Sequence, residues 1–236
     1  MTAILPLLST IVSVVFAGAT FSQWLSRRKP YQLVWTLGLL MYGLGAGSEY
    51  VAAVWGLSDP VYRLWYLAGA ILVAAYLGMG TVYLLAPRNY AHAAMAILVL
   101  GSIYAAYKVF GARIDLQLLP GGPTGISGVA MPGDVRLLTP LFNIFGTVGL
   151  VGGAAYSAWV FWRKRILPRR MVSCILIAVG GVLPAFGGTL MRFGIPELFF
   201  LMEFLGVSVI FAGFLVNTEI LALRTARDPA PAPSRG

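Results

Sequence analysis

Seven long apolar runs dominate this sequence. They cover approximately residues 3–25, 31–56, 62–86, 91–111, 136–161, 170–192 and 196–221. Each is close to the roughly 20 residues that a helix needs to cross the hydrocarbon core of a bilayer. Backbone N–H and C=O groups must be paired within the chain in lipid, so runs of this kind form helices. The sequence therefore predicts an all-α integral membrane protein with seven transmembrane helices.

The composition favours a bilayer over water as the solvent. The 236 residues are 59% hydrophobic and 11% charged, whereas a soluble domain has about 25% charged residues. A net charge of +9 would suggest nucleic acid as a partner of a soluble protein. Here the basic residues lie in short clusters between apolar runs, as loops of membrane proteins do. We therefore expect the lipid bilayer, and not nucleic acid, as a partner.

Lysine and arginine are distributed unevenly between the two sides that seven alternating helices define. The richer side holds Arg27, Arg28, Lys29, Arg88, Arg163, Lys164, Arg165, Arg169, Arg170, Arg224, Arg227 and Arg235, and the other side holds Arg63, Lys108, Arg113, Arg136 and Arg192. Cytoplasmic loops carry the excess of basic residues. The pattern predicts an outside N-terminus and a cytoplasmic C-terminus in the inner (plasma) membrane. The first run has no basic residue before it, so we interpret it as a retained helix and not as a cleaved signal peptide.

The chain is predicted to form one transmembrane domain, residues 1–223, followed by a Pro-rich tail, 224–236, that we expect to be disordered. Residues 1–86 and 136–223 share landmarks in the same order, among them Pro6 with Pro140. These matches predict a parallel 3+1+3 helix repeat, although apolar helices also match by chance. The remaining parts are a linker helix at 91–111 and an outer loop at 112–135. That loop is long for a structureless connection, which indicates a lid or a re-entrant segment.

Parallel repeats with this helix count and orientation resemble the SWEET sugar transporters. The Pro-Gln pair that marks the wider family of those transporters is absent, so the resemblance implies architecture alone. Microbial rhodopsins also have seven helices in this orientation. The run 196–221 contains no lysine to hold retinal, so that class is excluded.

Two carboxylates, Glu49 and Glu203, lie inside apolar runs at similar depth. Each is about seven residues from the outer end of its helix, or roughly 10 Å at 1.5 Å per residue. Ionisable groups at membrane depth are costly and are functional hypotheses by default. Two adjacent carboxylates in a low dielectric can hold a cation or load and release a proton. One alternative is that Arg63, Lys108 or Arg192 reaches inward to neutralise them. Another is that the two acids line a water-filled vestibule with no specific task.

Several neighbours of these acids complete the candidate ligand- or proton-binding site. We include Tyr50, Asn143 and Arg192 with Glu49 and Glu203. Gly43, Gly45 and Gly47 precede Glu49 and permit close helix packing that would aim it into the bundle. Pro184 is expected to kink the sixth helix and to shape a cavity with Asn143. The alternatives are a kink with no cavity and an Asn143 side chain that bonds a neighbouring helix. The six tryptophans, Trp24, Trp35, Trp55, Trp65, Trp159 and Trp162, fall near helix ends and predict an aromatic belt.

No enzymatic motif supports a catalytic function. The sequence has no nucleotide-binding glycine pattern in context, no HExxH and no nucleophile elbow. With one cysteine and one histidine, a Cys- or His-built metal site is not expected, and we expect no cofactor. The sequence favours a carrier for a small solute or cation. The alternatives are a non-transporting sensor or accessory subunit bound to a membrane-protein partner and, with less support, lipid- or quinone-linked chemistry.

Overall fold

The computed structural model describes residues 3–115, 118–119, 126–192 and 196–227, with the side chains at 189–192, 196–197 and 217–227 outside the description. Across these residues the chain is helical and contains no strand. The helices are α1 (Ile4–Arg27), α2 (Pro30–Trp55), α3 (Asp59–Leu64), η1 (Trp65–Leu72), α4 (Val73–Leu85), α5 (Arg88–Gly111), η3 (Gly128–Ala130), α6 (Gly133–Arg136), α7 (Leu138–Thr147), η4 (Val148–Gly152), α8 (Gly153–Arg163), α9 (Pro168–Arg192) and α10 (Pro196–Arg227). In the described part, seven helical stretches are long and apolar enough to cross a membrane. The predicted class of multi-pass helical membrane protein is confirmed. Most of the predicted tail, residues 228–236, lies outside the described residues.

The third and fifth spans differ from the simple helices that the apolar runs predict. Each contains a π-helical stretch: η1 joins α3 to α4, and η4 joins α7 to α8. A π-helix pairs residue i with i+5, so the hydrogen-bond pattern is interrupted where it meets an α-helix. Such segments often mark functional sites. The hydropathy of a run does not reveal them.

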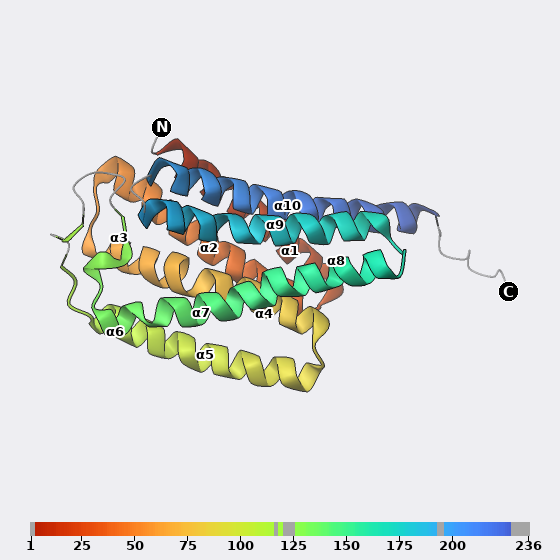
Figure 1. Ribbon diagram of the computed structural model, residues 1–236, viewed down its shortest axis with the longest axis horizontal. Helices are drawn as coiled ribbons and strands as arrows, with labels where there is room; N and C mark the ends of the chain where they lie inside the picture. Colours follow the sequence, from red (N-terminus) through yellow and green to blue (C-terminus); the bar gives the residue numbers. More distant parts are fainter. Residues whose placement is uncertain (1–2, 116–117, 120–125, 193–195, 228–236) are drawn as a thin grey trace.

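Six of the spans pack as a closed ring. In the described residues, α1 contacts α2 and α10, α2 contacts α4, and α4 contacts α7 and η4. The circuit closes because η4 and α8 pack on α9, and α9 packs on α10. Helix α5 is outside this ring: it contacts α4, η1 and α6 and lies at the edge of the bundle (Figure 1). The predicted linker helix is thus the peripheral one.

Glycines let α4 and α7 approach to backbone contact. A Cβ atom built on Gly78 would lie 2.4 Å from the carbonyl oxygen of Gly146, and one on Gly146 would lie 2.2 Å from the carbonyl carbon of Ala74. No side chain fits in either place without separating the two helices. Small residues are the usual means by which transmembrane helices pack this closely.

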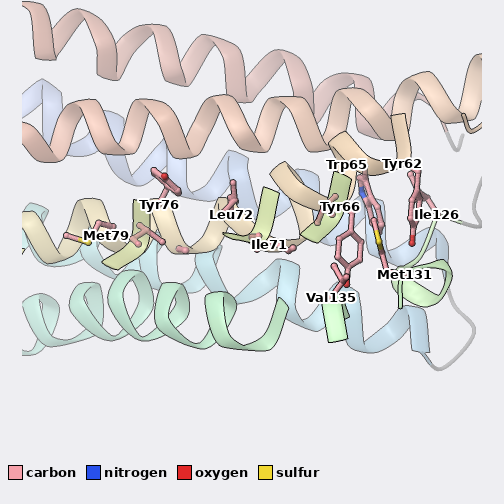
Figure 2. Close-up of a cluster of buried hydrophobic side chains, with 14 of the residues drawn as sticks. Tyr62, Trp65, Tyr66, Ile71, Leu72, Tyr76, Met79, Ile126, Met131 and Val135 are labelled. Carbon is pink, nitrogen blue, oxygen red and sulfur yellow. The ribbon is translucent and has the colours of Figure 1, made fainter. Parts of the chain in front are cut away.

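The two ends of the bundle have different character. We call residues 126–136, which contain η3 and α6, the cap segment, and the end where it lies the cap end. Ile126, Met131 and Val135 of this segment are at most 3% exposed and pack on the aromatic residues at the start of η1 (Figure 2). The opposite end, where the turn between α8 and α9 lies, is called the basic end.

Candidate functional site

Glu49 of α2 and Glu203 of α10 come together near the cap end. Glu49 is 2% exposed, Glu203 is half-buried, and their carboxyl groups lie within hydrogen-bonding reach of each other. Glu49 stands six residues before the end of α2, and Glu203 stands seven residues after the start of α10. Both are therefore about 10 Å from their helix ends at 1.5 Å per residue. The two acids meet although 154 residues separate them in the sequence.

One oxygen of each carboxyl group is buried and receives no hydrogen bond from a donor in the described residues. The indole Nε1 of Trp65 donates a hydrogen bond to Glu49 Oε1 over 2.8 Å. The Tyr42 hydroxyl donates to the backbone carbonyl of Glu203 over 2.7 Å, which ties α2 to α10. Among the described residues, Oε2 of Glu49 and Oε2 of Glu203 are both buried without a hydrogen-bond partner. Unpaired buried acceptors are costly, so this place suits a proton or a cation.

Two of the three basic residues that could neutralise this pair are engaged elsewhere. Arg63 Nε lies 2.6 Å from an Asp59 carboxylate oxygen, and the guanidinium also donates to the carbonyls of Phe110 and Ala112. Lys108 is bonded to Asp134. The side chain of Arg192 lies outside the description. The alternative in which Arg63 or Lys108 pairs with the membrane-embedded acids is therefore wrong.

A backbone contact between α2 and η1 brings Trp65 to Glu49. A Cβ atom on Gly45 would lie 2.8 Å from Cα of Gly69. Glu49 is one turn beyond Gly45, and Trp65 is one turn before Gly69, so the two side chains share the face of that contact. Glu49 consequently points into the protein and not toward lipid, as the sequence predicts.

The other two glycines before Glu49 have a different neighbour. Gly43 and Gly47 face α1, where added Cβ atoms would meet the nearest side-chain atoms at 3.5 and 3.7 Å. These are ordinary van der Waals distances. Gly45, and not the Gly43/Gly47 pair, makes the closest approach.

The structure gives contacts for two of the remaining predicted site residues, Asn143 and Tyr50, while the side chain of Arg192 lies outside the described residues. The Asn143 side-chain amide donates to the Ala70 carbonyl over 3.0 Å, so it satisfies a backbone group inside the π-helical η1. The Tyr50 ring packs edge-on against Trp55, with ring centroids 5.9 Å apart. Pro184 lies within α9, where its ring would be 2.9 Å from a Cβ atom on Gly206. Pro184 therefore packs tightly on α10, and the cavity with Asn143 stays a prediction.

Trp65 is the site residue that the sequence did not identify. It was expected in the aromatic belt, but it is only 7% exposed and contacts Glu49. Trp35 also departs from the belt, because its Nε1 donates to the Leu77 carbonyl over 3.0 Å. Trp55 and Trp162, which are 72% and 66% exposed, fit the prediction. Its depth in the membrane could have identified it, because Trp65 is as many residues from the end of its span as Glu49 is.

An apolar layer separates the carboxyl pair from a second polar cluster. Phe16, Leu39, Leu77, Val207 and Ile210 are each at most 7% exposed and form one packed cluster. Leu39 lies ten residues from Glu49 toward the basic end, or about 15 Å along α2.

The second cluster joins α1 and α2 nearer the basic end. The hydroxyls of Thr20 and Thr36 lie 2.9 Å apart, and the Gln32 amide donates to the Gln23 amide oxygen over 3.4 Å. Thr20, Gln32 and Thr36 are at most 5% exposed. Two buried polar layers, one near each end of the ring, are thus divided by an apolar one.

The chain matches no family model, no curated protein and no solved structure. In the described residues there is also no group of three or more His, Cys, Asp and Glu that could hold a metal ion. Functional inference therefore depends on the carboxyl pair and the layers around it.

Proposed function

We propose that this multi-pass protein of the inner (plasma) membrane is a carrier. It binds a small solute or a cation in the outer half of the helix ring, and Glu49 and Glu203 provide carboxylate-dependent coupling. The observation that supports this proposal most directly is the pair itself. Two carboxyl groups meet in a buried place, one oxygen of each has no hydrogen-bond donor among the described residues, and neither Arg63 nor Lys108 compensates them.

The chemistry of such a pair suits coupling. Two negative charges close together in a low dielectric repel strongly, so binding of one proton or one cation is favourable. The same ion must leave for the cycle to repeat. A carboxyl pair that is exposed to one side of the membrane at a time can bind the ion from that side. It can release the ion when it becomes exposed to the other side. The cap segment on one side and the apolar layer on the other are the barriers such a cycle requires.

The packing of the ring supports the parallel repeat that the sequence predicts. Under that repeat α1, α2 and α3–α4 correspond to α7–α8, α9 and α10. The contacts of α1 with α2, of α2 with α4 and of α1 with α10 then have counterparts in those of α8 with α9, of α9 with α10 and of α7 with α4. Such an arrangement has an axis along the membrane normal through the ring. Transporters place their sites at the interface of repeats, and Glu49 and Glu203 lie on different halves.

The test begins with thermal melting of the purified full-length chain against monovalent and divalent cations, small polar solutes and quinones at several pH values. A compound that binds the folded protein raises its melting temperature. We expect at least one compound to stabilise the wild type but neither Glu49→Gln nor Glu203→Gln. Asp134→Asn is the matched control, because it removes an exposed carboxylate of the Lys108 bridge, and it should respond like the wild type.

Compounds that stabilise the wild type but neither glutamate variant are then tested for transport across a membrane. The protein is reconstituted in liposomes, and uptake of the compound is recorded together with internal pH. We expect uptake by the wild type that is abolished in Glu49→Gln while that variant stays folded. Unchanged uptake by Glu49→Gln would remove the carboxyl pair from the mechanism.

The second candidate is a non-transporting sensor or accessory subunit. The position of α5 outside the ring favours it, because Ile97, Leu100 and Tyr107 of this helix are 71%, 68% and 75% exposed. In a complex these residues would contact another membrane protein, whereas in an isolated carrier they contact lipid. A stable protein that copurifies with the chain, together with no flux by the purified chain, would favour this candidate.

A further inference from the structure

A pocket of about 530 Å³ opens at the basic end, between the last turn of α8 and the first turn of α9. Its lining includes Phe161, Trp162, Arg163, Arg165, Ile166 and Met171; we call it the basic pocket. It is far from the carboxyl pair, which lies near the opposite end of the bundle. The proposed carrier function makes no use of it.

The turn that forms this pocket has an unusual backbone. Arg165 and Leu167 have φ angles of 50° and 49°, a left-handed conformation that side chains other than glycine seldom adopt. The turn is held by hydrogen bonds from Lys164 N to Val160 O and from Ile166 N to Phe161 O. This backbone holds Arg165 in the pocket wall at a conformational cost.

The turn and its flanks carry an excess of positive charge that no salt bridge compensates in the part of the chain that the structure describes. Arg163, Lys164, Arg165, Arg169 and Arg170 lie within eight residues. Among the described residues none of them forms a salt bridge, and the nearest recorded partner of the Arg163 guanidinium is the ring of Trp159, 5.4 Å away. The Nε atom of Arg170 is buried without a hydrogen-bond partner. Mutual repulsion of these cations favours binding of an anion.

The apolar part of the pocket narrows the class of anion. Trp162 and Ile166, 66% and 45% exposed, stand beside Arg163 and Arg165. Aromatic residues at this position along a span sit at the level of lipid headgroups. Arginine binds phosphate in a planar, two-pronged geometry. A ligand that satisfies both features has a phosphate head and a hydrocarbon body.

We propose that the basic pocket binds the phosphate of an anionic phospholipid, with Arg163 and Arg165 on the phosphate and Trp162 and Ile166 beside the acyl chains. The shared chemistry is a phosphate ester. We expect a lipid and not a soluble molecule to supply this phosphate, because the exposed apolar side chains of the pocket suit acyl chains. Basic pockets between helices at the cytoplasmic face are known to bind such headgroups.

The test titrates phosphatidylglycerol into the delipidated full-length protein in neutral detergent and follows thermal melting. Phosphatidylcholine and glycerol 3-phosphate are titrated in parallel. We expect stabilisation by phosphatidylglycerol alone. In Arg163→Gln/Arg165→Gln the half-saturating lipid concentration should rise about thirtyfold, the ratio for losing two basic contacts at an anionic surface.

The matched control is Arg27→Gln/Arg28→Gln, which removes the same charge at the same end of the bundle, where α1 ends. It should keep wild-type lipid dependence. An equal loss in both double variants would overturn the pocket in favour of non-specific charge attraction. Stabilisation by glycerol 3-phosphate as strong as that by phosphatidylglycerol would overturn the lipid as the source.

A second measurement covers the case in which the arginine variant folds poorly. Phosphatidylglycerol brominated on its acyl chains quenches nearby tryptophan. Quenching should fall in Trp162→Phe relative to the wild type and should be unchanged in Trp55→Phe, which alters an exposed tryptophan at the cap end. Equal quenching in the wild type and Trp162→Phe would place the acyl chains elsewhere and overturn the proposal.

Discussion

Trp65 and Glu49 form the most informative side-chain pair in this protein. The indole donor satisfies one carboxylate oxygen and leaves the other open. A tryptophan N–H can only donate, so it holds the oxygen of Glu49 whether or not the acid carries a proton on its second oxygen. The carboxyl group is therefore oriented without being neutralised, which is what a site that must bind and release a cation needs.

Removing the indole donor should destabilise the protein. In Trp65→Phe, Glu49 Oε1 loses its buried partner, and we expect the free energy of unfolding to fall by about 1–2 kcal/mol. Denaturant or thermal unfolding in detergent measures this. Trp55→Phe is the control, because Trp55 is 72% exposed and should change stability little. If the two substitutions cost the same, the hydrogen bond to Glu49 is not stabilising.

At the scale of elements, glycines decide which helices touch and where. Gly45 and Gly69 set α2 against η1, and Gly78 and Gly146 set α4 against α7. Asn143 then bonds the Ala70 carbonyl inside the π-helical stretch. The π-helical segment is thus supported from both sides, by α2 and by α7. These contacts fix the position of Trp65, which lies one helical turn before Gly69.

Alanine at two neighbouring glycines should have opposite consequences. Gly45→Ala places a methyl group 2.8 Å from Gly69 Cα, where neither backbone can yield cheaply, and should lower the free energy of unfolding by about 1–3 kcal/mol. Gly43→Ala meets its nearest atom at 3.5 Å. It should be neutral or stabilising by up to about 1 kcal/mol, because alanine favours a helix. Thermal melting of both variants in the same detergent compares them, and equal melting temperatures would show that the α2–η1 contact is not close.

At the scale of the whole molecule, the two ends differ in charge and in closure. The cap segment covers the end near the carboxyl pair, and the basic cluster between α8 and α9 lies at the other end. If the excess of basic residues faces the cytoplasm, as the distribution of Lys and Arg predicts, the cap end faces outward. The proposed solute would then enter from the outside, past the cap segment.

This orientation can be measured by cysteine labelling. In a Cys174→Ser background, Ser58→Cys marks the cap end and Lys164→Cys marks the basic end; both positions are exposed. We expect a membrane-impermeant maleimide to label Ser58→Cys in intact cells and Lys164→Cys only after permeabilisation. The reverse pattern would invert the predicted orientation and place the carboxyl pair near the cytoplasm.

The sequence by itself determined the class of fold and the depth of the two acids. Hydrocarbon imposes helices of a set length on apolar runs, so the spans and the similar depth of Glu49 and Glu203 follow from counting residues. That Glu49 faces the protein and not lipid could also be anticipated from the glycines beside it. These are local properties, because each depends on one segment and its solvent.

Only the tertiary structure decided which residues meet. Gly45 meets Gly69 at backbone distance, whereas Gly43 and Gly47 meet α1 only at ordinary van der Waals distances. Trp65 leaves the aromatic belt for Glu49, and Asn143 bonds a π-helical carbonyl and not an acid. Arg63 and Lys108 pair with Asp59 and Asp134 near the cap end. These outcomes depend on the rotation of each helix about its axis and on its neighbours. In a bilayer every apolar face of a helix is equally well solvated by lipid, so hydropathy says little about the rotation of a helix or about its neighbours. Close packing between particular helices determines both.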